Sequence, residues 1–273
     1  MPKVRTYGLD VDTLAFAVRV KAGSGKTILP ENLKQINKFV IGIKKLGLWD
    51  DMICWPMRSV HNAGRGSTLY SLGGGGTYNG TFTNNTNWSY NGVVMSAVTS
   101  DDISLVNFPI NDLINGLNLI AYFVPIGSSP ALSTASNYFN IYYPSASVFY
   151  TFGHSGTGGT TGVMSNFYSN DGQRYFTGGL NWSNTVRNQP ICYAVSNKKI
   201  IGVTPSASIT NTGNLSQAIP RISPNTLIFR PINGDAGCTL EFVVIINNFD
   251  TVANRQLIQD LYNKTLRTRR IYF

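Results

Sequence analysis

The chain has 273 residues, of which 42% are hydrophobic and 12% aromatic, enough for one large core. Only 13% are charged, a low share that favours a protein held in an assembly, and the net charge is +9. The basic residues are scattered and form no recognisable binding motif, so we expect no nucleic-acid partner. Residues 1–5 precede no signal-peptide core and no apolar run is long enough to span a bilayer, so we expect neither secretion nor membrane insertion.

Two helices are predicted near the N-terminus. The first covers about residues 10–20, has Asp10 or Asp12 near its start, and places on one side Val11, Leu14, Ala15 and Val18. After a break at 22–26, Pro30 opens a second helix near 31–46, whose apolar stripe is Leu33, Ile36, Phe39, Val40, Ile43 and Leu46. Gly47 predicts the end of this helix, and Trp49 is expected to return to the core.

From about residue 60 to residue 250 the sequence is typical of an all-β region, because short apolar and aromatic runs alternate with Gly, Asn and Ser clusters. The predicted strands are 68–72, 93–97, 104–108, 117–124, 138–143, 148–153, 163–169, 174–178, 191–195, 199–204, 226–230 and 239–246. Asn170-Asp171-Gly172 predicts a hairpin turn, since Gly accepts a positive φ.

A third helix is predicted near 251–266, directly after the last strand. Asp250 is its expected N-cap, and its expected buried face consists of Val252, Leu257, Ile258, Leu261 and Leu266.

The N-terminal motifs carry a resemblance to a known family. They are Asp10-Val-Asp-Thr-Leu-Ala-Phe16, Ile36-Asn-Lys-Phe-Val40 and Leu46-Gly-Leu-Trp-Asp-Asp-Met52, and they precede a Gly- and Asn-rich β region. This order resembles bacteriophage virion proteins with a concanavalin A-like (laminin G-like) jelly-roll domain. The resemblance implies a mainly β fold: a jelly-roll β-sandwich with two N-terminal helices and one C-terminal helix. It divides the chain into an N-terminal arm and helical region, 1–57, and a sandwich with its closing helix, 58–273.

The resemblance also implies a function. We expect a non-enzymatic structural component of a phage virion, displayed on the capsid, collar or tail as a decoration or fibre-type protein and assembled in the host bacterial cytoplasm. Its expected partners are other virion proteins and further copies of itself, for example in a trimer. The alternative is a lectin-like protein that recognises a host surface glycan.

Aromatic side chains among polar and Gly residues carry the lectin-like alternative, because sugars stack on exposed rings and hydrogen-bond to nearby amides. The predicted glycan-binding residues are Tyr78, Trp88, Tyr90 and Trp182, and Tyr150 lies in a similar setting. The other interpretation places Trp88 and Trp182 in the core and the tyrosines at surface strand positions.

No catalytic residue is predicted. Glu31 and Glu241 are the only glutamates, and no strand carries two acids at alternating positions. A retaining glycosidase needs two carboxyls about 5–5.5 Å apart. The alternative interpretations of Glu241 are a solvent-facing strand residue or a partner of an arginine.

No cofactor or metal site is predicted either. Gly23-Ser-Gly-Lys-Thr27 lacks the first glycine of a phosphate-binding loop, and Pro30 follows it closely. His61 and His154 have no neighbour at metal-ligand spacing. Calcium stays open at the small Asp and Asn clusters, which are 101–102, 235 and 247–250. The three cysteines are expected to be buried, reduced thiols: Cys54, Cys192 and Cys238.

Overall fold

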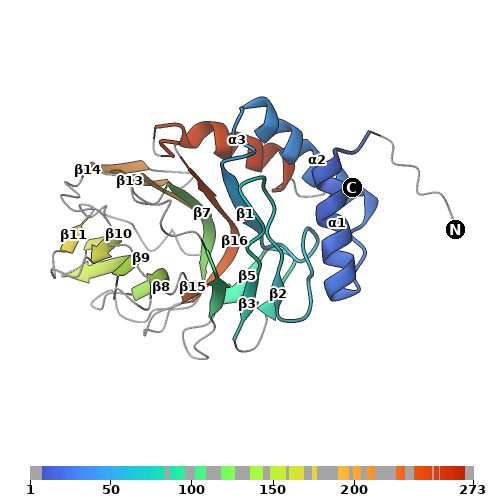
Figure 1. The fold of residues 1–273 in the computed structure, drawn as a ribbon. Helices are drawn as coiled ribbons and strands as arrows, with labels where there is room; N and C mark the ends of the chain where they lie inside the picture. The colour runs from blue at the N-terminus through green and yellow to red at the C-terminus, as the bar shows by residue number, and fades with distance from the viewer. Residues whose placement is uncertain are drawn as a thin grey trace, which may run out of the picture.

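The computed structural model describes residues 8–83, 87–95, 102–108, 118–126, 136–143, 148–157, 160–168, 174–176, 190–196, 199–203, 208–212, 226–230, 237–247, 249–251 and 253–267. Two antiparallel β-sheets contain about half of these residues, and three helices lie against one of the sheets (Figure 1). The predicted mainly β chain with two N-terminal helices and one C-terminal helix is therefore confirmed.

Helices α1 (Val11–Ser24) and α2 (Pro30–Lys45) form the N-terminal layer. Asp10 is the N-cap of α1, because its Oδ1 accepts a hydrogen bond from the Asp12 N–H at 3.0 Å. Past the end of α2, Gly47 has a φ of 69°, and the Leu48 N–H closes the last turn onto the Ile43 carbonyl at 3.2 Å. Gly47 thus ends α2 as predicted.

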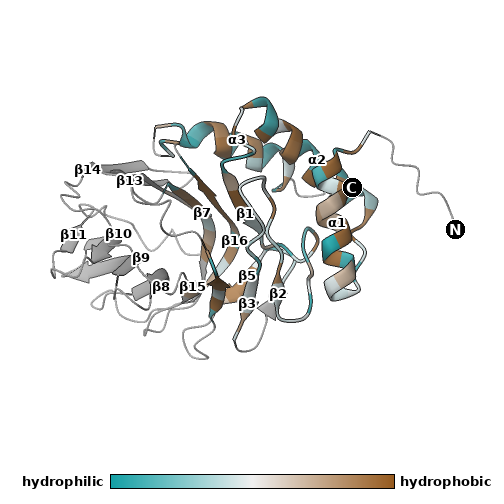
Figure 2. Cartoon of the chain, in the orientation of Figure 1, coloured by the Kyte–Doolittle hydropathy of each residue, from teal (hydrophilic) through white to brown (hydrophobic). Residues whose placement is uncertain are grey.

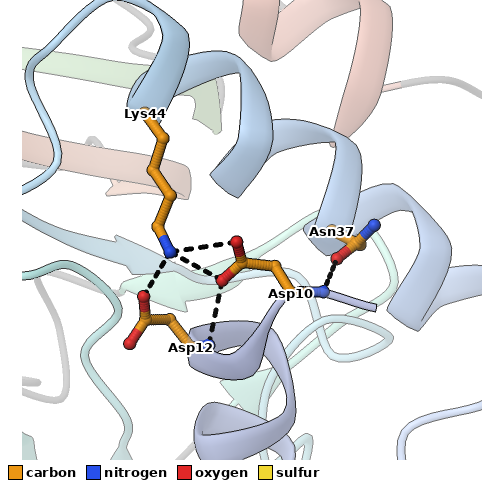
Figure 3. A network of polar contacts seen from close by, with 4 residues as sticks. All are labelled: Asp10, Asp12, Asn37 and Lys44. Atoms are coloured by element: carbon orange, nitrogen blue, oxygen red, sulfur yellow. Dashed lines mark hydrogen bonds and ion pairs between the residues drawn. The ribbon is translucent and has the colours of Figure 1, made fainter. Parts of the chain in front are cut away.

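One ion-pair network joins the two helices (Figure 3). The Lys44 ammonium lies 2.8 Å from Asp10 Oδ1 and also contacts Asp12, and the Asp10 N–H donates to Asn37 Oδ1 at 2.7 Å. Burial alone would raise the pKa of Asp10, but the hydrogen bonds from Lys44 and the Asp12 N–H outweigh it and lower that pKa. The two aspartates of the first motif therefore hold α1 on α2.

The two helices differ in how well the sequence predicts their buried side. In α2 the predicted residues Ile36, Phe39, Val40 and Ile43 are buried, whereas Leu46, past the last turn, is 39% exposed. In α1 the residues predicted to share a side do share it, but that side faces solvent: Val11 is 72% and Val18 65% exposed. The buried side consists of Thr13, Phe16 and Val20.

The first sheet contains eight strands. In spatial order they are β14 (Ser208–Thr212), β13 (Lys199–Val203), β12 (Ile191–Ser196), β7 (Leu119–Ile126), β16 (Gly237–Ile246), β5 (Val93–Met95) and β4 (Asn87–Trp88), and β1 (Met52–Pro56) also pairs with β16. Strand β1 lies within the range 1–57 that the sequence suggests for the N-terminal region, yet it belongs to this sheet.

The second sheet also contains eight strands. In spatial order they are β11 (Arg174–Phe176), β10 (Thr160–Tyr168), β9 (Val148–Thr157), β8 (Ser136–Tyr143), β15 (Thr226–Arg230), β6 (Ile103–Val106), β3 (Gly80–Phe82) and β2 (Thr68–Leu69). Every predicted strand overlaps an observed one. The prediction missed β1, β3, β4 and β14, which are short or, for β1, buried at every residue without alternation.

The predicted turn at 170–172 lies outside the described residues. The strands on either side of it pair as a hairpin would require, with Tyr168 opposite Arg174 in antiparallel register.

Helix α3 (Arg255–Thr265) begins later than predicted. Asp250 Oδ1 accepts the Ala253 N–H at 3.0 Å and so caps the turn that precedes the helix, while Asn254 occupies the N-cap. The predicted buried residue Leu257 is 49% exposed, and Tyr262, which the prediction omitted, is buried. Val252 lies outside the described residues.

The core has two layers. Between the sheets, Trp55 of β1 lies 5.7 Å from Phe229 of β15 and 6.0 Å from Phe108, measured between ring centroids. On the outer face of the first sheet, Phe242 of β16 lies 5.5 Å from Phe39 of α2 and 4.8 Å from Tyr262 of α3. Because both faces of β16 are covered, its run from Leu240 to Ile246 is buried without interruption. Figure 2 shows β16 mostly in brown, the colour of hydrophobic residues.

Candidate functional site

The structure brings two of the predicted glycan-binding residues together on one hairpin. Trp88 ends β4, and Tyr90 lies in the turn before β5. The loop 58–67 runs beside this hairpin: the Ser59 N–H donates to the Ser89 carbonyl at 2.9 Å, and Trp88 Nε1–H donates to the Gly66 carbonyl at 3.2 Å. We call the surface formed by loop 58–67, Lys26 and residues 88–91 the Tyr90 surface.

Tyr90 is the most exposed of the predicted residues whose exposure the structure describes, at 50%. The Arg58 guanidinium lies 4.7 Å from its ring centroid, and Arg58 Nε–H donates to the Tyr90 carbonyl at 3.0 Å. Arg58 is itself buried and donates a further hydrogen bond of 2.7 Å to the Leu266 carbonyl at the end of α3. A buried cation thus holds the exposed ring in one position.

Trp88 is half-buried. It packs against the core, and its ring meets the Phe82 ring at 5.5 Å and 64°. Gly92 permits the close approach of this hairpin to β16: its φ is 151°, and a Cβ there would lie 2.4 Å from the Leu240 carbonyl oxygen. Trp88 therefore anchors the hairpin that carries Tyr90 to the core.

Tyr78 and Trp182 do not join this surface among the described residues. Tyr78 is half-buried, packs edge-on against Phe108 at 5.2 Å, and accepts a 2.7 Å hydrogen bond from Trp55 Nε1–H at its carbonyl. No described ring contact links Tyr78 to Trp88 or Tyr90, and its contacts belong to the core between the sheets. Trp182 lies outside the described residues.

The Tyr90 surface also gathers positive charge, which the sequence did not reveal. The Lys26 ammonium donates to the carbonyls of Ser59 and Asn62, and exposed Arg65 donates from Nε to the Ser24 carbonyl at 2.9 Å. Burial, together with the nearby charge of Arg65, lowers the pKa of Lys26. None of the ion pairs recorded between described residues involves Lys26, Arg58 or Arg65. The surface is thus suited to an anionic group.

The loop that carries Arg58 and Arg65 is fixed from inside. Asn62 is fully buried, and its side chain donates to the carbonyls of Pro56 and Tyr70 at 2.9 and 2.8 Å and accepts the N–H groups of Ala63 and Tyr70. His61 is buried beside α2, with Nε2 at 2.6 Å from Gln35 Oε1. Burial and the charges of Arg58 and Lys26 lower the pKa of His61 to about 3.

We expect His61 to make the protein less stable as the pH falls. In the unfolded chain its pKa returns to the ordinary value near 6.5, so below that pH the unfolded state binds a proton that the folded state excludes down to about pH 3. As the pH falls below 6.5, the free energy of unfolding should decrease by up to about 1.4 kcal/mol per pH unit. Urea unfolding at pH 7, 6 and 5 measures it, in a range where carboxylates contribute little. In His61→Gln the part of the pH dependence of stability that His61 causes should disappear. If the free energy of unfolding falls equally with pH in both proteins, His61 is not the cause.

Glu241 is committed to structural contacts. It is 7% exposed and lies at the irregularity of β16 between Leu240 and Phe242. The Tyr262 hydroxyl donates to its Oε2 at 3.0 Å, and Arg267 Nε lies 3.2 Å from the same oxygen. Burial and this carboxylate raise the pKa of Tyr262. The interpretation of Glu241 as the partner of an arginine is the one the structure shows.

The remaining chemistry of the described residues is limited. They contain no group of three His, Cys, Asp or Glu side chains that could hold a metal ion. Cys54, Cys192 and Cys238 are buried and free, as predicted, and burial raises the pKa of Cys192 to about 11. Among the helices of the described part, none has the length and hydropathy needed to cross a membrane.

No family model and no curated protein matches the sequence. Solved structures with a similar fold are a receptor binding domain (TM-score 0.54, 10% identity, 79% of this chain and 52% of that one) and the binding domain of botulinum neurotoxin DC. The latter is similar in its complex with rat synaptotagmin II (TM-score 0.53) and in its complex with SialylT (TM-score 0.52), each at 10% identity over 78% of this chain and 52% of that one. The chain thus spans about half the length of these structures. The likeness shows a β-rich fold that binding domains also use.

Proposed function

We propose that this chain is a non-enzymatic recognition protein whose Tyr90 surface binds an acidic glycan. One observation carries the proposal: the half-exposed Tyr90 ring is held by buried Arg58 and lies on the same surface as Lys26 and Arg65. A sugar ring would stack on Tyr90, and its carboxylate would pair with an exposed cation such as Arg65. The complex of a similarly folded domain with SialylT supports this choice of ligand class.

Binding of sialyllactose and of lactose, measured by titration calorimetry, tests the proposal. We expect saturable binding of the acidic trisaccharide, at least tenfold weaker binding of lactose, and a loss of affinity as the salt concentration rises. In Tyr90→Ala the affinity should fall at least tenfold, whereas Arg65→Ala should chiefly remove the preference for the acidic sugar.

The matched control is Val106→Ala on β6, because Val106 is 59% exposed and lies on the other sheet. This variant should bind as the unmodified protein does. If neither sugar binds, or if Tyr90→Ala binds sialyllactose unchanged while Val106→Ala weakens it, the Tyr90 surface is not the glycan site.

The absence of hydrolysis is part of the same proposal. Glu241, the only glutamate of the β region, already accepts hydrogen bonds from Tyr262 and Arg267. A glycosidase needs a second positioned carboxyl beside such a group. Incubation with bacterial capsule and lipopolysaccharide should therefore release no new reducing ends.

The jelly-roll topology and the virion setting form a second proposal, which the N-terminal motifs favour. Their residues build the helical layer: Asp10 and Asp12 bind Lys44, and Phe16 and Phe39 are fully buried. On this proposal the chain is displayed on a phage capsid, collar or tail and reaches it in the host cytoplasm. Mass spectrometry and a reconstruction of purified particles would give its position and copy number, and its absence from particles would refute the setting.

A further inference from the structure

Helix α1 carries an apolar stripe on its solvent side, opposite the side that enters the core. The stripe consists of Val11, Leu14, Ala15, Val18 and Ala22, whose spacing places them in one line along the helix. Val11 and Val18 are 72% and 65% exposed, the two largest values among the large hydrophobic side chains in the described part of the chain. Figure 2 shows α1 as brown and white over most of its length, at the outer edge of the molecule.

The order of the valines and alanines in the stripe is self-complementary when two copies of α1 lie antiparallel. Around a two-fold axis near the middle of the helix, Val11 faces Ala22 of the other copy, and Ala15 faces Val18. Each valine then lies opposite an alanine, so that the side chains of one helix fill the gaps of the other. A parallel arrangement would instead place valine on valine and alanine on alanine.

The charges of α1 favour the same orientation. Its N-cap Asp10 and first-turn Asp12 carry two negative charges, of which their shared partner Lys44 offsets one, and its last turn is basic, with Lys21. Antiparallel packing brings the basic end of each helix beside the acidic end of the other, and it also opposes the two helix dipoles. In a parallel pair the ends of like charge would meet.

We propose that a second copy of this chain covers the stripe, in an antiparallel α1–α1 contact around a two-fold axis. The contact is short compared with standard protein interfaces, so the dimer should be weak in isolation. This proposal is independent of the glycan-binding one: the stripe and the Tyr90 surface use different residues, and variants of one should leave the other unchanged.

Sedimentation at protein concentrations up to about 0.5 mM tests the dimer, in the range where weak protein contacts populate measurably. The dissociation constant should rise at least tenfold in Val18→Glu, a change at an exposed position that should not affect folding. Lys21→Glu leaves the apolar stripe intact and should also weaken the dimer, because it places like charges together. The matched control Val106→Glu on β6 should dimerise normally. A monomer throughout the concentration range would overturn the proposal.

Cross-linking tests the orientation. An antiparallel pair places position 15 of one copy opposite position 18 of the other, so a mixture of Ala15→Cys and Val18→Cys should form disulfide-linked dimers faster than either variant alone. The native cysteines are buried and should not interfere. Faster linkage within the separate variants than in the mixture would indicate a parallel contact and overturn the proposed geometry.

Discussion

Replacing Trp55 by alanine should lower the free energy of unfolding by about 3–5 kcal/mol, the usual cost of removing a fully buried large aromatic side chain. Trp55 is 0% exposed and joins the two sheets through its ring contacts with Phe108 and Phe229. Its Nε1–H also satisfies the Tyr78 carbonyl at 2.7 Å. The variant therefore leaves a cavity between the sheets and an unpaired carbonyl beside it.

Chemical denaturation measures this loss. Trp55→Phe keeps most of the ring volume and removes the hydrogen bond, so it should cost less than the alanine variant. Trp88→Ala, at a half-buried position, should also cost less. If Trp55→Ala unfolds at the same denaturant concentration as the unmodified protein, the sheets do not depend on this contact.

The second large effect is expected at Glu241. Glu241→Gln keeps the shape of the side chain but removes the charge that pairs with Arg267 and strengthens the hydrogen bond from Tyr262. Breaking a buried pair costs about 3–5 kcal/mol, and we expect about 2–3 kcal/mol here because the Arg267 side chain is 24% exposed.

A double-mutant cycle with Arg267→Met measures the coupling. The cost of Glu241→Gln should fall when Arg267 is already absent, and Tyr262→Phe should cost less than Glu241→Gln. Additive costs would show that the ion pair contributes nothing. The same variant also serves the activity assay: if Glu241→Gln abolished a measurable release of reducing ends, the protein would be a hydrolase.

The helices show what local sequence can and cannot predict. In α2 a single apolar stripe determines the buried side, and Ile36, Phe39 and Val40 are buried as expected. In α1 both sides carry apolar residues, so periodicity does not identify the side that enters the core. Phe16 and Val20 join the core cluster of Phe39 and Phe242. That tertiary contact leaves the apolar stripe of α1, on the opposite side, in solvent.

Local sequence likewise predicts some residues of the candidate site and misses others. Trp88 and Tyr90 were predictable, because aromatic residues in a polar, Gly-rich segment are a local signal. Arg58 was not, because it contacts Tyr90 across 32 residues and Leu266 across 208. Lys26 belongs to a segment that imitates the end of a phosphate-binding loop, and the structure instead uses its ammonium to hold loop 58–67. Such long-range contacts have no signature in sequence spacing.

The most direct test of the glycan-binding claim is an NMR titration of the indole N–H signals with sialyllactose. The chain has four tryptophans, and the Trp88 indole N–H donates to the Gly66 carbonyl within the Tyr90 surface. Trp49 and Trp55 are buried away from that surface and should not respond. We predict a saturable shift of the Trp88 signal that is absent in Tyr90→Ala. A shift of the Trp182 signal without one at Trp88, or no shift at all, would contradict the proposed site.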